Sequence, residues 1–96
     1  MAEVILDGKN IQTESDFHRV MAELLDFGPY YGRNLGALWD RLSTDLERPV
    51  SSVWIDSGVS EECLGAYFYE IIKIFEKVKQ QDLMFDWAER FEYVLR

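Results

Sequence analysis

Short segments rich in β-branched residues alternate along this chain with longer segments whose apolar residues recur at helical spacing. Residues 3–8 (EVILDG) are typical of a strand that stops at the Asp7-Gly8 turn, and residues 50–55 (VSSVWI) of a second strand introduced by Pro49. Strands that are separated by helices can pair in parallel, because the crossover needs a dozen or more residues. The sequence therefore predicts an α/β fold, in which helices pack on a small parallel sheet.

Two long segments outside the strands have the periodicity of amphipathic helices. The first helix is capped by Thr13 or Ser15 and ends at Gly28-Pro29. Its apolar face contains Phe17, Val20, Met21, Leu24 and Leu25. The later helix begins at Ser60, where Glu61 and Glu62 follow, and its wide apolar stripe predicts that it is largely buried. Gly65 is placed to divide it into a short and a long helix.

The C-terminal segment, residues 83–96, predicts a last strand without fixing its position. Phe85 and Trp87 alternate with polar residues in the first half, and Phe91, Tyr93 and Leu95 alternate in the second half. Either half can supply the strand.

The chain is acidic, with 18 acidic against 10 basic residues and a formal net charge of −8 over 96 residues. This length corresponds to one domain, residues 1–96. The charge repels nucleic acid and anionic membranes, and it attracts basic surfaces. An equally weighted interpretation is that acidity only keeps the protein in solution.

Cys63 is the only cysteine, so an intrachain disulfide is impossible and a reducing compartment is expected. The N-terminus has no basic start followed by an apolar core, and no apolar run is long enough to span a membrane. We therefore expect a cytoplasmic protein.

Residues 29–40 (PYYGRNLGALWD) lead from a loop into a second helix, which begins near Asn34 as N-cap. Its inward stripe contains Leu35, Leu38, Trp39 and Leu42. Helix geometry then places Gly36, Asp40, Ser43, Thr44 and Glu47 on the opposite face, and Asp45 joins its rim if the helix unwinds after about residue 43. The result is an exposed patch of carboxylates and hydroxyl groups.

Two features beside this patch have both a structural and a binding interpretation. Gly36 is either a mildly unfavourable residue in a solvated turn or a flat spot that lets a partner approach. Gly32 is expected to supply an unusual backbone turn next to Tyr30 and Tyr31. We expect one tyrosine to cover the sheet and the other to project as a binding anchor.

The residues give no support for an enzyme. His18 is the only histidine, and we expect it at the surface or at the boundary of the core. No cluster of cysteine and histidine has metal-ligand spacing, and no phosphate-binding glycine loop is present. Cys63 is expected near a helix start as a free structural thiol. Asp40 and Asp45 have no companion acid–base system. No cofactor or metal is therefore expected.

The segment YYGRNLGALWD (30–40) is close to the pattern Tyr-Tyr-Gly-x-Asn-Leu-x-x-Leu-Trp-Asp, and the chain resembles the barstar family, intracellular inhibitors of the secreted ribonuclease barnase. The similarity runs from about residue 4 to about residue 80. It implies a three-stranded parallel sheet with three or four helices packed on it. It also implies that the second helix and the preceding loop block a ribonuclease active site.

The resemblance assigns roles to individual residues. Asp40 would occupy the pocket meant for an RNA phosphate, and Tyr30 would pack over the catalytic histidine of the nuclease. Gly32, Asn34 and Ser43 would frame the contact. The complete set of expected partner-binding residues is Tyr30, Tyr31, Gly32, Asn34, Gly36, Asp40, Ser43, Thr44, Asp45 and Glu47.

The chain departs from the barstar pattern at three positions. Gly36 stands where the family has an aspartate, Asp45 where it has a tryptophan, and Lys77 where it has a glutamate. The expected partner is therefore a basic extracellular-type ribonuclease related to barnase, or the nuclease domain of a toxin, against which the chain would be an immunity protein. A general acidic interaction module with a non-nuclease partner is the alternative. We expect a 1:1 complex, no direct contact with nucleic acid or membrane, and a monomer when free.

Overall fold

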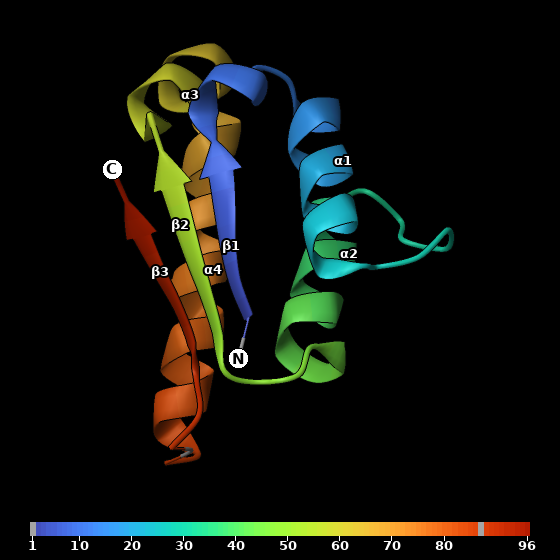
Figure 1. Cartoon of the computed structure of the whole chain (residues 1–96), viewed down its shortest axis with the longest axis vertical. Coiled ribbons are helices and arrows are strands. Elements are labelled where there is room, and N and C mark those ends of the chain that lie inside the picture. Colours follow the sequence, from blue (N-terminus) through green and yellow to red (C-terminus); the bar gives the residue numbers. More distant parts are fainter. Residues whose placement is uncertain (1, 87) are drawn as a thin grey trace.

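The computed structural model describes residues 2–86 and 88–96, with the side chains of Ala2 and Asp45 left out. Its elements, traced in Figure 1, follow in the order β1 (Ala2–Asp7), the 3-10 turn η1 (Gly8–Asn10), α1 (Glu14–Leu25), α2 (Leu35–Asp40), the π-helical turn η2 (Arg41–Asp45), β2 (Val50–Ile55), α3 (Ser57–Leu64), α4 (Ala66–Met84) and β3 (Phe91–Leu95).

The three strands form one parallel sheet in the order β1-β2-β3. Val50 in the central strand lies opposite Ala2 on one side and Phe91 on the other. Figure 1 shows α4 behind the sheet, while α1 and α2 lie on the side of β1. The predicted three-stranded parallel sheet with helices packed on it is confirmed.

The core lies between the helices and one face of the sheet. Trp54 of β2 is fully buried, and its ring stacks on Phe17 of α1 with 5.5 Å between centroids. Phe75 of α4 packs against Phe91 of β3, also at 5.5 Å. Aromatic rings from two helices and two strands therefore meet in one cluster, which buries much apolar area per residue.

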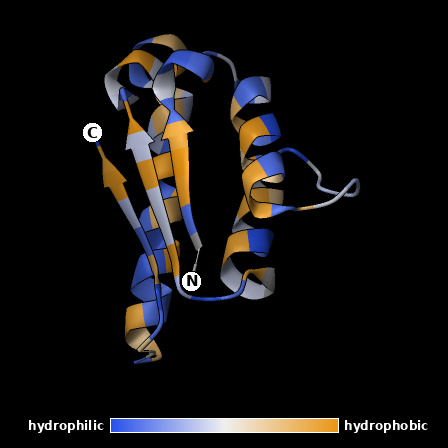
Figure 2. Ribbon diagram, viewed as in Figure 1, coloured by the Kyte–Doolittle hydropathy of each residue, from blue (hydrophilic) through white to orange (hydrophobic). Residues whose placement is uncertain are grey.

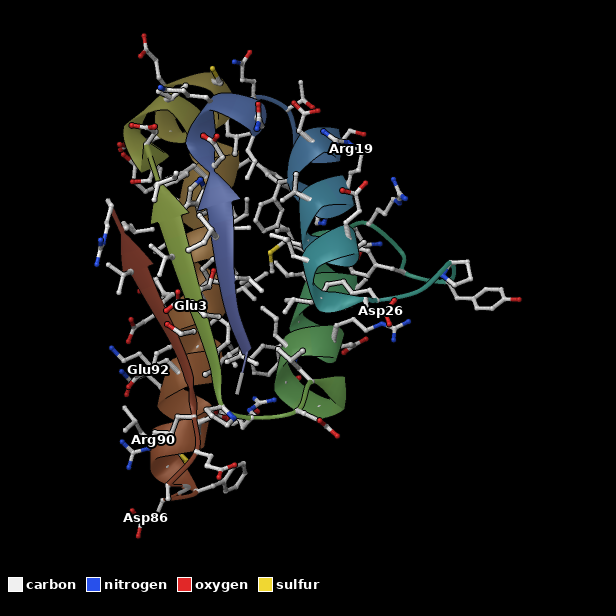
Figure 3. All side chains as sticks on the ribbon, viewed as in Figure 1. Glu3, Arg19, Asp26, Asp86, Arg90 and Glu92 are labelled. Atoms are coloured by element: carbon white, nitrogen blue, oxygen red, sulfur yellow. The ribbon has the colours of Figure 1, made fainter. Side chains whose placement is uncertain are left out.

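The opposite face of the sheet is open. Ile5 of β1 and Val94 of β3 are 47% and 43% exposed, because alternate strand residues point away from the helices. Figure 3 shows Glu3 and Glu92 along the same two outer strands, and both are exposed. Parallel sheets are usually covered on both faces. Here the polar residues that flank the apolar ones keep one face in water (Figure 2).

α1 begins at a capping box and ends earlier than predicted. Thr13 is the N-cap, since its side chain accepts from the Asp16 amide at 3.0 Å while the Asp16 carboxylate accepts from the Thr13 amide at 3.2 Å. Asp26 adopts a left-handed conformation (φ 54°) and terminates the helix before Gly28-Pro29. Leu24, predicted on the buried face, is 43% exposed.

The later helical segment begins at Ser57, three residues before the predicted start, and Gly65 divides it into α3 and α4 as predicted. Ser60 has a different role from that of a cap. It is fully buried, accepts a hydrogen bond from Trp54 Nε1 at 3.1 Å and donates one to the Gly8 carbonyl oxygen at 3.1 Å. The hydroxyl thus ties α3 to the ends of two strands.

The last strand comes from the second half of the C-terminal segment. β3 (Phe91–Leu95) pairs with β2. The first half of the segment instead contains the end of α4, which continues to Met84 and has Phe85 as its C-cap. Trp87, which was part of the apolar–polar alternation in the first half of this segment, lies outside the described residues.

A buried ion pair joins the segment before β2 to α4 and β3. The Arg48 guanidinium donates from Nε and Nη2 to the two carboxylate oxygens of Asp82, both at 3.0 Å, and the two side chains are 8% and 0% exposed. Asp82 Oδ2 also accepts from the Phe91 amide at 2.8 Å. One carboxylate therefore holds three separate segments together.

His18 is buried, 1% exposed, and the prediction that it lies at the surface or boundary is wrong. Its Nδ1 lies 2.7 Å from the Tyr31 hydroxyl and its Nε2 lies 2.6 Å from the Tyr67 hydroxyl. Both ring nitrogens are thus satisfied away from water, which is the condition for burying a histidine. Burial, and then the charge of Arg33, lowers the pKa of His18. Burial also raises the pKa of Tyr31 and of Tyr67, so both hydroxyls keep their protons.

Asp82→Ala is expected to lower the free energy of unfolding by about 3–5 kcal/mol, because a buried guanidinium then loses its carboxylate. Glu70→Ala is the matched control, since Glu70 pairs with Lys73 in solvent, where such pairs contribute little. Urea unfolding followed by tryptophan fluorescence measures both. Similar losses in the two variants would contradict a structural role for the buried pair.

The free energy of unfolding is also expected to fall as pH decreases from about 7 to about 5. In this window the unfolded chain protonates His18 near its ordinary value of 6.5, whereas the folded protein, with its lowered pKa, resists the proton. The groups facing the ring are Arg33, Tyr31 and Tyr67, with Glu14 beside Tyr67.

The carboxylates of Asp16 and Glu76 contribute little to this pH dependence between about pH 7 and about pH 5. Hydrogen bonds, from the Gln12 amide to Asp16 and from the Gln80 side chain to Glu76, lower the pKa of these two acids, so both stay ionised. His18→Gln should therefore have a nearly flat stability profile between about pH 7 and about pH 5 in urea titrations. If the free energy of unfolding changed equally with pH in the wild-type protein and in His18→Gln, His18 would not be the source of the pH dependence.

Candidate functional site

The candidate site consists of the α1–α2 loop (residues 26–34) and the outer face of α2 and η2. Figure 1 shows this loop extending away from the body of the molecule before the chain returns into α2. Asp26 lies at its base in Figure 3, where α1 ends. The loop is pale in Figure 2, and so offers little strongly hydrophobic surface.

Asn34 starts α2 and shapes the turn before it. Its Oδ1 accepts from the Ala37 amide at 2.7 Å, and its Nδ2 donates to the Gly32 carbonyl oxygen at 3.3 Å. The predicted N-cap is confirmed. The unusual backbone expected at Gly32 is found instead at Arg33, which is left-handed (φ 54°). A Cβ at Gly32 would lie 3.2 Å from Ala37 Cβ, a tight contact that the side chain of Ala37 would have to relieve by a small shift.

The outer face of α2 comprises Gly36, Asp40, Thr44 and Glu47, all of which are exposed. Within the described part of the chain, the carboxylates of Asp40 and Glu47 form no hydrogen bond or ion pair. The Thr44 hydroxyl donates to the Asp40 carbonyl oxygen at 2.6 Å. Asp40 thus presents its charge to solvent from a helix whose backbone is fixed on both sides.

Ser43 does not belong to this exposed face. It is only 7% exposed, and its carbonyl oxygen accepts from Gln81 Nε2 of α4 at 3.1 Å. The helical turn changes from α to π at Arg41, so the α-helical spacing used for the prediction no longer applies there. Asp45 belongs to the π turn, but its side chain lies outside what the structure describes.

The two tyrosines of the loop differ in exposure: one is covered and the other projects, as predicted. Tyr30 is 90% exposed, the highest value among the exposed large hydrophobic residues, whereas Tyr31 is 6% exposed and packs on Phe27 with 4.7 Å between ring centroids. A rigid aromatic side chain in water has the chemistry of an interface anchor.

α4 borders the outer face with a cation that sequence periodicity did not reveal. Lys77 Nζ lies 4.6 Å from the ring centroid of Trp39, the residue before Asp40. The ring holds the ammonium group by a cation–π contact and leaves it partly in water. Comparison with the barstar pattern had marked Lys77 as a departure, but its contact with Trp39 could not be predicted because the two positions are 38 residues apart along the chain.

An open hollow adjoins the end of η2. It is lined by Ser43, Thr44, Leu46, Arg48, Ala88 and Glu89. Two predicted site residues, Ser43 and Thr44, thus contribute to its wall. The hollow lies between the end of η2 and the loop before β3.

The described residues contain no group of three or more histidine, cysteine, aspartate or glutamate side chains able to hold a metal ion. Cys63 is a free, exposed cysteine near the end of α3, and not near a helix start as expected. Among the helices the structure describes, none has both the length and the apolar character needed to cross a membrane.

Two comparisons with known proteins agree with this geometry. The Barstar family, described as barstar (barnase inhibitor), matches residues 1–95. "Putative ribonuclease inhibitor YrdF" of Bacillus subtilis (strain 168) is 31% identical over 81 residues, which cover 84% of this chain and 89% of that protein. The parallel sheet, the Asn34-capped helix and the exposed Asp40 occur together in a chain that belongs to the Barstar family.

Proposed function

We propose that this protein inhibits a basic microbial ribonuclease by placing the outer face of α2 in the active site of the enzyme. The name of its family and the name of its B. subtilis relative both refer to ribonuclease inhibition. In the proposed 1:1 complex, Asp40 takes the place of an RNA phosphate, and Tyr30 packs beside it. The producing cell is thereby protected from its own or a neighbouring nuclease.

The observation that carries this proposal is the exposure of Asp40. Its carboxylate lies in solvent on a helix capped by Asn34 and bonded at its C-terminal side by Thr44. A helix backbone held in this way loses little conformational freedom on binding. This lowers the entropic cost of forming an ion pair.

The charge of the whole molecule supports the same mechanism. A ribonuclease cleft is basic because it must bind phosphate groups, and the inhibitor has a net charge of −8. Opposite charges accelerate the encounter, and close ion pairs slow dissociation. Because a carboxylate has no phosphodiester bond, the nuclease cannot cleave the group that fills its pocket.

The surroundings of Asp40 favour a nuclease other than barnase. Gly36, where family members have an aspartate, leaves open space on the outer face, and a Cβ there would meet only Asn34 Oδ1 at 3.4 Å. Lys77 adds a positive charge next to Trp39. A partner with a less uniformly basic cleft fits this rim better. The nuclease domain of an antibacterial toxin is such a candidate, and the protein would then be its immunity protein.

Asp40→Ala is expected to weaken inhibition far more than Glu47→Ala. Removing one member of a desolvated charge pair costs about 2–5 kcal/mol, a range to which complexes of this same family have contributed. Glu47 lies at the end of the face, where contacts stay hydrated and contribute less. Calorimetric titration against each ribonuclease that the wild-type protein inhibits measures both variants.

Folding controls keep this comparison interpretable. Neither carboxylate has a side-chain partner in the described part of the chain, so both variants should unfold at nearly the wild-type urea concentration. Equal losses of affinity would count against a central role for Asp40. The wild-type protein should also be tested against a panel of basic ribonucleases that includes toxin nucleases. If it inhibits none of them, a non-nuclease partner is favoured instead.

The association rate is expected to fall by at least about tenfold between roughly 0.02 M and roughly 0.5 M salt, because screening shortens the range of the attraction. The dissociation rate should change much less, since the contact pairs are desolvated. Stopped-flow mixing of inhibitor with nuclease measures both rates. An association rate independent of salt would show that net charge does not steer the encounter.

A further inference from the structure

We propose that His18 is a positioning residue for partner binding: through Tyr31 it holds the α1–α2 loop, and with it Tyr30, in the orientation that meets the nuclease. The binding part of this inference rests on the proposed function. The loop-ordering part concerns the free protein and stands independently.

The α1–α2 loop has little support of its own. Residues 29 and 30 form a turn, and none of residues 28–33 belongs to a helix or strand. Apart from the contact between the Tyr31 hydroxyl and His18, the side-chain hydrogen bond that reaches this stretch runs from Asn34 Nδ2 to the Gly32 carbonyl oxygen. A loop with so few internal bonds depends on a side chain to fix its position.

Tyr31 is the side chain that supplies this attachment. Between residues 28 and 34 it is the only buried residue, 6% exposed, while its neighbour Tyr30 is 90% exposed. Its ring packs on Phe27, and its hydroxyl reaches His18 Nδ1 at 2.7 Å. Tyr30 directly precedes Tyr31 and lies in the turn at residues 29 and 30, so fixing Tyr31 also restricts where Tyr30 can point.

His18 is itself held from two sides, which makes it a firm anchor. Its ring lies edge-on to Phe17 with 5.2 Å between centroids, and Nε2 reaches the Tyr67 hydroxyl of α4 at 2.6 Å. In neutral imidazole one nitrogen donates and the other accepts, so each tyrosine hydroxyl has a matched role. The chain Tyr67–His18–Tyr31 thus connects α4 and α1 to the loop.

Asp40 does not depend on this anchor. α2 is capped by Asn34 and contacts α4 through Trp39 and Lys77. Loosening the loop should therefore displace Tyr30 and leave Asp40 in place. If His18 only contributed to stability, its loss would affect Tyr30 and Asp40 alike, whereas a positioning role affects Tyr30 alone.

The first experiment uses the free protein. Tyr31→Phe keeps the ring and removes only the hydroxyl, and His18→Phe removes both nitrogens. The ¹⁵N order parameters of residues 28–33 are expected to fall below about 0.6 in these variants, while those of α1 and α2 stay near about 0.85. Tyr93→Phe is the matched control, because it also loses a tyrosine hydrogen bond, to Glu76 at 2.7 Å, far from the loop.

The second experiment measures coupling in binding to a ribonuclease that the wild-type protein inhibits. If the loop keeps its competent orientation about a tenth of the time, Kd rises about tenfold in Tyr31→Phe. Adding Tyr30→Ala to this variant should then weaken binding less than it does in the wild-type protein. Adding Asp40→Ala should weaken binding by the same factor in both backgrounds.

Each result decides the proposal. The proposal is supported if residues 28–33 alone become disordered and if the effect of Tyr31→Phe on Kd is coupled to Tyr30→Ala but not to Asp40→Ala. Unchanged order parameters, or additive effects of Tyr31→Phe and Tyr30→Ala, would overturn it. If the wild-type protein inhibits no ribonuclease, the proposed function fails, and the order parameters alone decide whether His18 positions the loop.

Discussion

The carboxylate of Asp82 is the constraint on which the arrangement of this fold most depends. It is fully buried, and it binds the Arg48 guanidinium and the Phe91 amide. Arg48 leads directly into β2, and Phe91 opens β3, so one group on α4 places two of the three strands. Such a charge is costly to bury and tolerable only when fully bonded, which makes alternative packings of α4 unfavourable.

Local signals predicted the elements that display the site. The Asn34 cap, the spacing of Leu38 and Leu42, and the strand at residues 50–55 each depend on near neighbours, and the structure has all of them. The difference in exposure between Tyr30 and Tyr31 was also expected, since one tyrosine was predicted to be covered and the other to project. The roles of these residues in binding a partner stay a proposal.

Contacts between distant segments were not predictable from periodicity. His18 is buried because two tyrosines, 13 and 49 residues away, satisfy its nitrogens. Ser43 is covered because the helix changes pitch and Gln81 of α4 lies against it. Neither partner is marked in the local sequence. A single apolar–polar pattern therefore assigned both residues to the surface.

The residues that hold the fold are different from those on the surface proposed to bind a partner. Asp82, His18 and Trp54 are buried and bonded, whereas Gly36, Asp40 and Lys77 are exposed and border one surface. A side chain can be added at Gly36, or a charge changed at Lys77, with little effect on the core. On the proposed function, such changes would alter the choice of nuclease without disturbing the buried network. Asp40 would keep its role as the central contact, because its carboxylate is exposed on a helix whose backbone is held by Asn34 and Thr44.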